Sequence, residues 1–316
     1  AQSFVIAHDF GTIDMDASSV GDEWNSGEEM TVVLYDQDLN LNTGSDEDLT
    51  VIGGTLVPSL TIGDPLSLKT GATVKDNTLG AAVASSSVTS FSKIATITTS
   101  TFTTTDTVMS INTKITGTEW AAYVALGGYE FINFDLRDLT TDVTHFKVGT
   151  SADDDTCVTQ TVSTSLNAGA ADGKEYVEFT PIADVCNAST DEIFVTFVTD
   201  DMKNDTSPAS FVVDFFTFSG TTNNAIYRLE LEESGDNTAE FVGSVEYVML
   251  NQLNVDQSST YAGVNAIQDD IDIIVHEDLT DEDSPRVNYL DLGADGVSTQ
   301  IADQEEAPTH SGSADL

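Results

Sequence analysis

The sequence is poor in basic residues. Its 316 residues include 10 Lys and Arg against 54 Asp and Glu, which gives a formal net charge of −44. Nucleic-acid binding needs clusters of Lys and Arg that neutralise phosphates, and anionic membranes attract proteins through the same side chains. The shortage of basic residues therefore argues against nucleic acid and against an anionic membrane surface as partners.

Long apolar runs are also missing. No run approaches the roughly 18 apolar residues that indicate a membrane-spanning helix, so we expect no span within this chain. The first residues, AQSFVIAHDF, lack the basic and apolar regions of a signal peptide. We therefore expect a mature form or a piece of a longer protein. The composition is 40% hydrophobic, which is enough for folded cores, and the length suggests two or three domains.

Recognisable catalytic motifs are absent as well. The sequence has no Gly-x-Ser-x-Gly elbow and no His-Glu-x-x-His pair. Its four histidines lie in separate segments, at His8, His145, His276 and His310. Trp24 and Trp120 are too few for a sugar-stacking surface, and we expect both in the core. We predict that the chain is not an enzyme.

Cysteine is scarce, with only Cys157 and Cys186. We favour a disulfide between them, and the alternative is two buried thiols. A disulfide and two glycosylation sequons, at Asn187 and Asn204, would fit an extracellular protein. In a chain so rich in Thr, however, both sequons can arise by chance.

The dominant pattern that is present has a period of two residues. Apolar and polar residues alternate over 227–232, and apolar positions recur at every second residue over 193–198 and 270–275. Such alternation is typical of half-buried β-strands. The apolar run FVVDFFTFS, residues 211–219, predicts a strand covered on both faces. We therefore predict an all-β protein built from tandem immunoglobulin-like β-sandwich domains, with no convincing helix over 12 residues.

Two segments are less regular. Residues 85–118 are very rich in Ser and Thr, which suits either a low-complexity stalk or folded strands, and their spaced Ile, Val and Phe residues favour strands. Residues 293–316 have few apolar residues and no obvious strand pairing. For them we expect a linker or the start of a following domain, with a frayed tail as the alternative.

Residues 36–47, which directly follow a predicted strand, are rich in acidic residues and asparagines. Counting from Asp36, the side chains at positions 1, 3, 5, 7, 9 and 12 of an EF-hand loop are Asp36, Asp38, Asn40, Asn42, Gly44 and Glu47. Position 6 is Leu41, where the loop needs Gly, and no helices flank it, so we expect no EF-hand. Alternate residues of an extended segment point the same way. Asp36, Asp38 and Asn40 are therefore candidate ligands of Ca²⁺ or another divalent cation, with a solvated acidic turn as the alternative.

Two further acidic clusters could bind a cation weakly. One is Asp153, Asp154 and Asp155 beside Cys157. The other precedes Pro285 and consists of Asp278, Asp281, Glu282 and Asp283. A solvated loop is the favoured interpretation of each.

Three segments resemble the surface-layer (S-layer) proteins of ammonia-oxidising archaea. They are TVVLYDQDLNLNTGSD (31–46), FFTFSGTTNNAIYRLELEESGDNTAEFVGSVEYVMLNQLNVD (215–256) and IDIIVHEDLTDEDSPRVNYLDLGADGVSTQIADQEEAPTHSG (271–312). In the first, a strand ends in Asp-x-Asp-Leu-Asn. The second contains Leu-x-Glu-x-x-x-Asn-Thr-x-x-Phe-x-Gly-x-Val, matched by Leu231, Glu233, Asn237, Thr238, Phe241, Gly243 and Val245. Residues 60–210 carry little of the resemblance.

The spacing of the two motifs suggests an inserted domain. In a simple module the two motifs would lie close together in sequence. Here they lie far apart, one at Asp36 and the other near Leu229. We therefore expect one split immunoglobulin-like sandwich from 1–58 and 211–292. Residues 59–210 would form an inserted β-sandwich region, of one or two small sandwiches, that contains both cysteines. Three sandwiches in series are the alternative.

The resemblance implies a structural function. Such proteins form porous, negatively charged two-dimensional lattices on the cell surface by self-assembly, and divalent cations stabilise these lattices. The net charge of −44 agrees with this, because fixed negative charge enriches cations such as ammonium near the surface. An extracellular adhesin or carbohydrate-binding sandwich is the alternative, and an extracellular hydrolase is disfavoured.

Overall fold

The computed structural model describes most of the chain. The described residues are 10–21, 24–54, 56–76, 82–97, 102, 107–158, 173–182, 186–200, 202–203, 208–219, 222–250, 255–275, 285–292, 298–304 and 309–310. Strands dominate these residues, so the prediction of an all-β protein is confirmed. The immunoglobulin-like character of the sandwiches stays a prediction.

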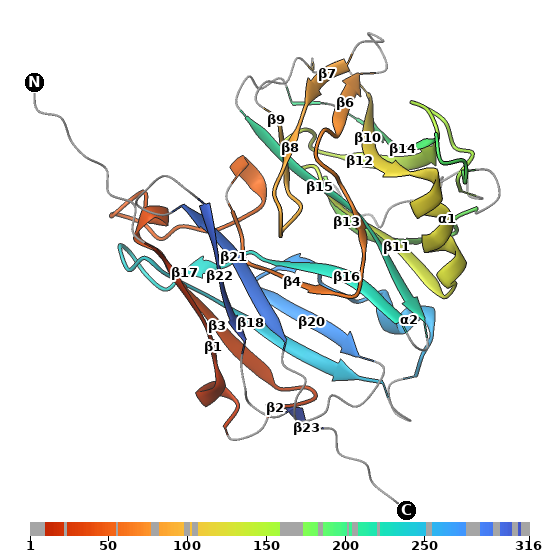
Figure 1. Ribbon diagram of the computed structural model, residues 1–316. Helices are drawn as coiled ribbons and strands as arrows, with labels where there is room; N and C mark the ends of the chain where they lie inside the picture. The colour runs from red at the N-terminus through yellow and green to blue at the C-terminus, as the bar shows by residue number, and fades with distance from the viewer. Residues whose placement is uncertain are drawn as a thin grey trace, which may run out of the picture.

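The strands form two smaller sheets and one long sheet (Figure 1). The first sheet contains β1 (Thr12–Asp16), β3 (Glu29–Tyr35), β17 (Glu232–Glu233), β18 (Glu240–Met249) and β20 (Asp270–Val275). The second sheet contains β6 (Thr73–Asp76), β7 (Ala82–Ser85), β10 (Val108–Thr116), β12 (Val143–Gly149) and β14 (Glu192–Thr199).

The long sheet runs in the order β13-β11-β15-β16-β4-β21-β22. Its strands are β4 (Ser59–Ile62), β11 (Tyr129–Asp135), β13 (Lys174–Phe179), β15 (Ala209–Ser219), β16 (Thr222–Leu229), β21 (Arg286–Leu292) and β22 (Ser298–Gln304). Short strands join its sides, namely β5 (Leu66–Ser67), β8 (Ser87–Val88), β9 (Ala95–Ile97) and β19 (Ile267–Gln268). A separate parallel pair joins β2 (Trp24–Asn25) to β23 (Thr309–His310).

Two hydrophobic cores lie between these sheets. The first core packs the first sheet against β4, β16 and β21, and it draws mainly on residues 13–60 and 212–289. The second core packs the second sheet against β11, β13 and β15, and its residues lie between 68 and 215. Trp24 belongs to the first core and Trp120 to the second, and both are fully buried, as expected.

Strand β15 belongs to both cores. It is the run predicted to be covered on both faces, and its side chains from Ala209 to Phe218 are all buried. Alternate residues serve opposite cores: Val212, Phe216 and Phe218 the first, Phe211, Val213 and Phe215 the second. Figure 1 shows β15 running from the upper to the lower part of the molecule. One strand and one sheet therefore serve both cores. The division into 1–58 with 211–292 and an insert at 59–210 stays a prediction.

A buried ion pair joins β15 to β16. Both Arg228 and Asp214 have side chains that are 0% exposed. The guanidinium of Arg228 donates from Nη1 and Nη2 to the two Asp214 oxygens, at 2.6 and 3.0 Å. Its Nε donates to the Ser92 carbonyl at 2.6 Å, and Asn133 Nδ2 donates to Asp214 at 3.2 Å. These contacts make the pair tolerable in the interior, where a charge without partners is costly.

A helix that was not predicted from the sequence begins at Gly117. Helix α1 (Gly117–Leu126) has a capping box in which the Thr116 and Glu119 side chains each accept a hydrogen bond from the other residue's backbone N–H. Thr-x-x-Glu before an apolar run is a known signal of a helix start. The helix is short and packs Trp120 and Tyr123 into the second core. A four-residue helix, α2 (Ser258–Tyr261), buries Tyr261 in the first core.

The C-terminal region also differs from expectation. Residues 293–316 were predicted to lack strand pairing, yet β22 pairs along its whole length with β21, from Ser298 to Gln304. Ile301 of this strand packs against the first core. Backbone pairing with β21 places this strand in the sheet, and such pairing leaves no apolar pattern in the sequence.

The predicted disulfide between Cys157 and Cys186 is confirmed. The two cysteines are separated by 29 residues and are fully buried in the second core. None of the helices in the described residues is long and apolar enough to cross a membrane. Residues 85–97 and 107–116 contain β8, β9 and β10, so folded strands rather than a stalk occupy the described part of the Ser/Thr-rich segment.

The buried pair gives a first prediction. Asp214→Asn leaves the Arg228 charge buried without its counter-charge, so we expect about 3–5 kcal/mol loss of unfolding free energy in denaturant melts. The matched control is Lys147→Met, which removes a partly exposed ion pair to Asp153 at 2.7 Å and should cost no more than about 1 kcal/mol. Equal losses in the two variants would contradict this account.

The disulfide gives a second prediction. Replacing both Cys157 and Cys186 by Ala should lower the unfolding free energy by about 3–4 kcal/mol, because the bond restricts the unfolded chain. Thermal melts of the oxidised protein, the reduced protein and the double variant measure it. Reduction should destabilise the wild type and leave the variant unchanged.

Candidate metal centre

Three carboxylates meet where strands of the first and long sheets end. Asp36, Asp38 and Asp291 each offer a ligand oxygen, and these atoms lie within 4.8 Å of one another. Asp36 directly follows β3, and Asp38 lies in the 3-10 turn Gln37–Leu39. Asp291 lies near the end of β21. Among the described residues, no other group of three such side chains approaches this closely.

Asp36 is held in place by the backbone and by a tyrosine. Its Oδ1 accepts the N–H of Asp38 at 2.9 Å, and its Oδ2 accepts the Tyr289 hydroxyl at 3.1 Å. Its own N–H donates to the Ala239 carbonyl at 3.0 Å. These contacts fix the carboxylate in one orientation, and its oxygens still have lone pairs for a cation.

Asp291 is held by the N-terminal segment. Gly11 N–H donates to Asp291 Oδ2 at 2.7 Å. A Cβ at position 11 would lie 3.0 Å from the Tyr35 carbonyl oxygen and 3.1 Å from Asp36 Cβ. Glycine therefore allows the first described residues to close over the site. Strands β1, β3 and β21 thus bring residues 11, 36 and 291 to one place.

The cluster is electrostatically unfavourable without a cation. Asp36 and Asp291 are each only 2% exposed. Burial raises the pKa of Asp36, and the neighbouring charges of Asp291 and Asp38 raise that pKa further, against hydrogen bonds from Asp38 and Tyr289 that lower it. Carboxylate oxygens are the ligands that Ca²⁺ and Mg²⁺ prefer. A divalent cation would remove the repulsion, so the donor set fits such an ion.

The third predicted ligand, Asn40, lies on the same turn. Its Nδ2 donates to Asn237 Oδ1 at 3.2 Å, and its Oδ1 is buried without a hydrogen-bond partner in the described part of the chain. Sequence reasoning missed Asp291, which the fold brings to Asp36 from far along the chain. The prediction of Asn40 as a ligand stays open.

Glu47 was noted only as position 12 of the rejected EF-hand pattern. Both of its carboxylate oxygens are buried and have no hydrogen-bond partner among the described residues. Its N–H donates to Glu233 Oε2 at 3.2 Å, and Glu233 Oε1 accepts the N–H groups of Thr238 and Ala239, both at 2.8 Å. Turn 233–239 therefore holds residues 36, 40 and 47 through separate contacts. The 12-residue spacing was the available signal for Glu47.

The second acidic cluster forms a turn with internal partners. Asp153 pairs with Lys147 at 2.7 Å. Burial raises the pKa of Asp154, but hydrogen bonds from Thr156 and Thr150 outweigh it and leave this pKa below its usual value. These protein donors take the place that a cation would have. The structure thus favours the solvated-loop alternative here.

The remaining predicted sites are distributed as follows. Asn187 is exposed in the loop after Cys186 and stays a predicted glycosylation site. Outside the described residues lie Asn204, Asp278, Asp281, Glu282 and Asp283.

Comparison with known proteins adds no family. No protein-family model matches the chain, and a search of curated proteins finds no significantly similar sequence. The resemblance to S-layer proteins therefore stays a hypothesis that rests on the three sequence segments.

The cluster gives a third prediction, on pH and calcium. Because the folded-state pKa of Asp36 is raised, its contribution to stability is complete below its unfolded pKa of about 3.9 and is lost as pH rises through the folded pKa. Without divalent ions, the contribution of Asp36 to the unfolding free energy should therefore decrease above about pH 4. Adding Ca²⁺ at about 100 times its Kd should restore about 2–3 kcal/mol at pH 8.

The matched variant is Asp36→Asn, compared by calorimetric melts. It should lose most of the calcium stabilisation and the pH dependence due to residue 36. Asp200→Asn removes one exposed negative charge elsewhere and should behave as the wild type. Equal calcium stabilisation of all three proteins would rule out this cluster as the site.

Proposed function

We propose that this chain is a structural segment of an extracellular S-layer, which assembles into a porous lattice stabilised by divalent cations. The observation that carries the proposal is the convergence of Asp36, Asp38 and Asp291 at a strand junction. Two of these carboxylates, Asp36 and Asp291, are buried. Backbone hydrogen bonds with Gly11 and Ala239 hold these two residues in place. A cation there would stabilise the arrangement of the two sheets rather than take part in chemistry.

The surface charge supports the same function. The chain has only 10 basic residues. Three of them form ion pairs with buried or half-buried carboxylates: Arg228 with Asp214, and Arg137 and Lys174 with Glu230. Most acidic side chains are thus left to solvent and counter-ions. A lattice of such subunits would concentrate cations, ammonium included, by diffuse electrostatics and without a dedicated ammonium pocket.

The disulfide supports an extracellular location. Disulfides persist in oxidising compartments and are rare in the cytosol, and this one is buried in a core. An exposed Asn187 sequon beside it agrees with that environment. Localisation on an archaeal cell surface follows from the resemblance described above.

Electron microscopy tests the proposal. With Ca²⁺, the full-length protein should form ordered two-dimensional sheets, and excess chelator should dissolve them. Asp291→Asn should raise the calcium concentration for half-maximal assembly at least tenfold, or about 1.4 kcal/mol, while the control Asp200→Asn should not. Monodisperse particles that are indifferent to calcium and chelator would refute the lattice function.

A further inference from the structure

Buried acceptor oxygens without partners gather in the 36–47 loop, which directly follows β3. Both carboxylate oxygens of Glu47 and the amide oxygen of Asn40 are buried, and none of them has a hydrogen-bond partner among the described residues. An ionised carboxylate and an amide oxygen can only accept hydrogen bonds. Buried polar groups are normally satisfied, and leaving them unpaired is costly. These oxygens therefore indicate a bound group that supplies positive charge or donors.

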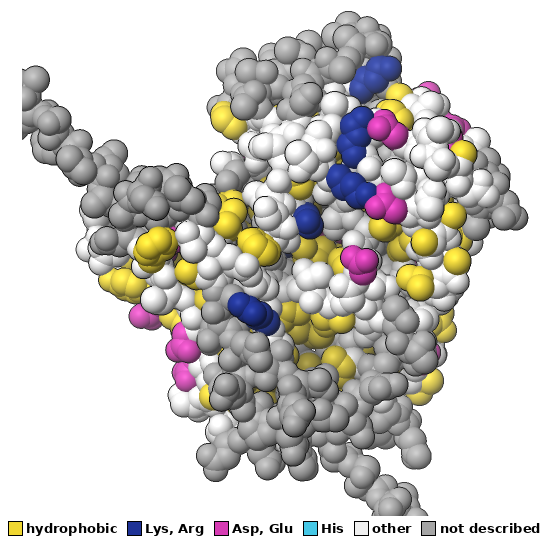
Figure 2. Space-filling view, in the orientation of Figure 1, with side chains coloured by type: hydrophobic (Ala, Val, Ile, Leu, Met, Phe, Trp, Pro, Cys, Tyr) yellow, Lys and Arg dark blue, Asp and Glu magenta, His cyan; other side chains and the backbone are white. Residues whose placement is uncertain are grey.

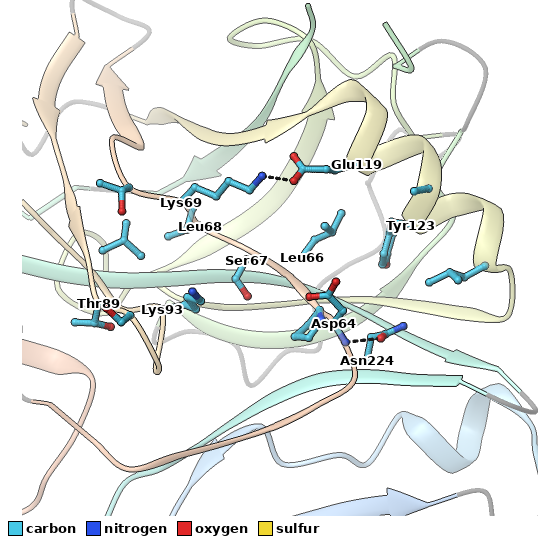
Figure 3. A pocket seen from close by; sticks show the side chains of 16 residues that line it. Asp64, Leu66, Ser67, Leu68, Lys69, Thr89, Lys93, Glu119, Tyr123 and Asn224 are labelled. Atoms are coloured by element: carbon cyan, nitrogen blue, oxygen red, sulfur yellow. Dashed lines mark hydrogen bonds and ion pairs between the residues drawn. The ribbon is translucent and has the colours of Figure 1, made fainter. Parts of the chain in front are cut away.

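The cavity beside β5 shows what a different set of unpaired groups looks like. It has a volume of about 870 Å³ and lies between β5, the segment 88–93 and helix α1 (Figure 3). Ser67 Oγ and Asn224 Nδ2 are buried there without partners among the described residues, but both of these groups can donate. The charged side chains that line this cavity sum to zero, namely Lys69, Lys93, Asp64 and Glu119. The cavity thus favours neither sign of charge, whereas the 36–47 loop offers acceptors alone.

No basic side chain of the chain neutralises the 36–47 loop. All 10 Lys and Arg lie within the described residues, and none belongs to the loop or to turn 233–239. Within the described part of the chain, none of them forms an ion pair with Asp36, Glu47 or Asp291. Figure 2 shows the dark-blue Lys and Arg side chains mainly on the upper part of the visible face, where Figure 1 places β6 and β10. Positive charge for this loop must come from a cation in solution.

The loop already brings two carboxylates to the candidate cation site. Oxygens of Asp36 and Asp38 lie within 4.8 Å of each other and of an Asp291 oxygen. Asn40 continues the same alternation, and Glu47 is the twelfth residue counted from Asp36, the position at which calcium loops place a bidentate glutamate. The spacing and the unpaired oxygens are independent observations, and both single out Asn40 and Glu47.

Turn 233–239 holds the two arms of the loop close to each other. The Ala239 carbonyl accepts the Asp36 N–H at 3.0 Å, and Glu233 Oε2 accepts the Glu47 N–H at 3.2 Å. The group of three carboxylates that meet in the structure does not include Glu47. Because the Glu47 carboxylate has no hydrogen bond to break among the described residues, a change of its side-chain rotamer toward Asp36 loses no such contact. Cation binding would therefore close the loop through Glu47.

We propose that Asn40 and Glu47 complete the candidate metal centre, so that one Ca²⁺ is held by a single loop and one strand. The loop supplies Asp36, Asp38, Asn40 and Glu47, and β21 supplies Asp291. With Glu47 bidentate, this set offers about six oxygens, and Ca²⁺ takes about six to eight in flexible geometry. Mg²⁺ demands a near-ideal octahedron and keeps several waters, so the set prefers Ca²⁺. The proposal deepens the cation-stabilised lattice function and rests on its cation site.

Titration calorimetry of the full chain with Ca²⁺ and with Mg²⁺ tests the role of Glu47. Glu47→Gln should weaken Ca²⁺ binding at least about tenfold, because even groups behind the ligands are worth about 10–100-fold in metal affinity. Asp46→Asn and Asp48→Asn remove the same charge from the exposed neighbours on either side and should bind as the wild type does. Mg²⁺ should bind the wild type more weakly than Ca²⁺. Equal weakening in all three variants would assign the effect to diffuse charge and refute the ligand role.

A matched pair of variants tests Asn40. Its Nδ2 donates to Asn237 Oδ1 at 3.2 Å, so both Asn40→Ala and Asn237→Gly remove this hydrogen bond. Glycine suits position 237, where φ is +59°. Only Asn40→Ala also removes the unpaired oxygen, so only this variant should lose Ca²⁺ affinity, again at least about tenfold. Equal affinities of the two variants would remove Asn40 from the ligand set.

Stability and hydrogen exchange separate a lost ligand from a damaged fold. Without Ca²⁺, Glu47→Gln removes a buried unpaired charge and should raise the melting temperature, although it weakens Ca²⁺ binding; a misfolded variant cannot give this pair of results. Saturating Ca²⁺ should slow amide exchange over 41–48 in the wild type and not in Glu47→Gln. Wild-type Ca²⁺ affinity in Glu47→Gln refutes this inference alone. Because these measurements use the unassembled chain, a failure to form sheets refutes the lattice function alone.

Discussion

The buried pair between Arg228 and Asp214 is the interaction on which the arrangement of both cores depends. A guanidinium and a carboxylate that are both fully buried must satisfy each other almost completely, and here the Ser92 carbonyl and the Asn133 amide supply the remaining contacts. Arg228 lies in β16, Asp214 in β15 and Asn133 in β11, and Ser92 lies in the segment before β9. The pair therefore lies at the point where the long sheet passes from one core to the other.

A second constraint is the shortage of positive charge. The basic residues at the junction of the cores neutralise acidic ones: Arg137 bridges Asp135 and Glu230 at 2.6 Å each, and Lys174 also contacts Glu230. Such partly buried pairs fix geometry more than they stabilise it. The acidic loops are left to be compensated by ions or by another molecule.

The sequence predicted what depends on local patterns and missed what depends on distant contacts. The alternation of apolar and polar residues and the apolar run 211–219 predicted strands, and the spacing of Asp36 and Asp38 predicted that they lie together. Each of these patterns involves only residues that are close in sequence. Asp291 could not be found in this way, since only the packing of the first sheet against the long sheet brings β21 to the end of β3. Strand β22 was missed because backbone hydrogen bonds leave no apolar pattern. Helix α1 had a local signal, the Thr116 and Glu119 capping box, that its short length concealed.

The turn 233–239 connects the cation site to the acidic surface. Glu233 is 5% exposed, and its carboxylate binds the backbone of Glu47, Thr238 and Ala239 at once. Glu47 is flanked by Asp46 and Asp48, and Ala239 accepts the N–H of Asp36. A cation that neutralises Asp36 and its neighbours would thus also order the turn that exposes the acidic side chains. Under the proposed function, calcium would then act within one subunit by ordering this acidic turn, as well as by screening charge.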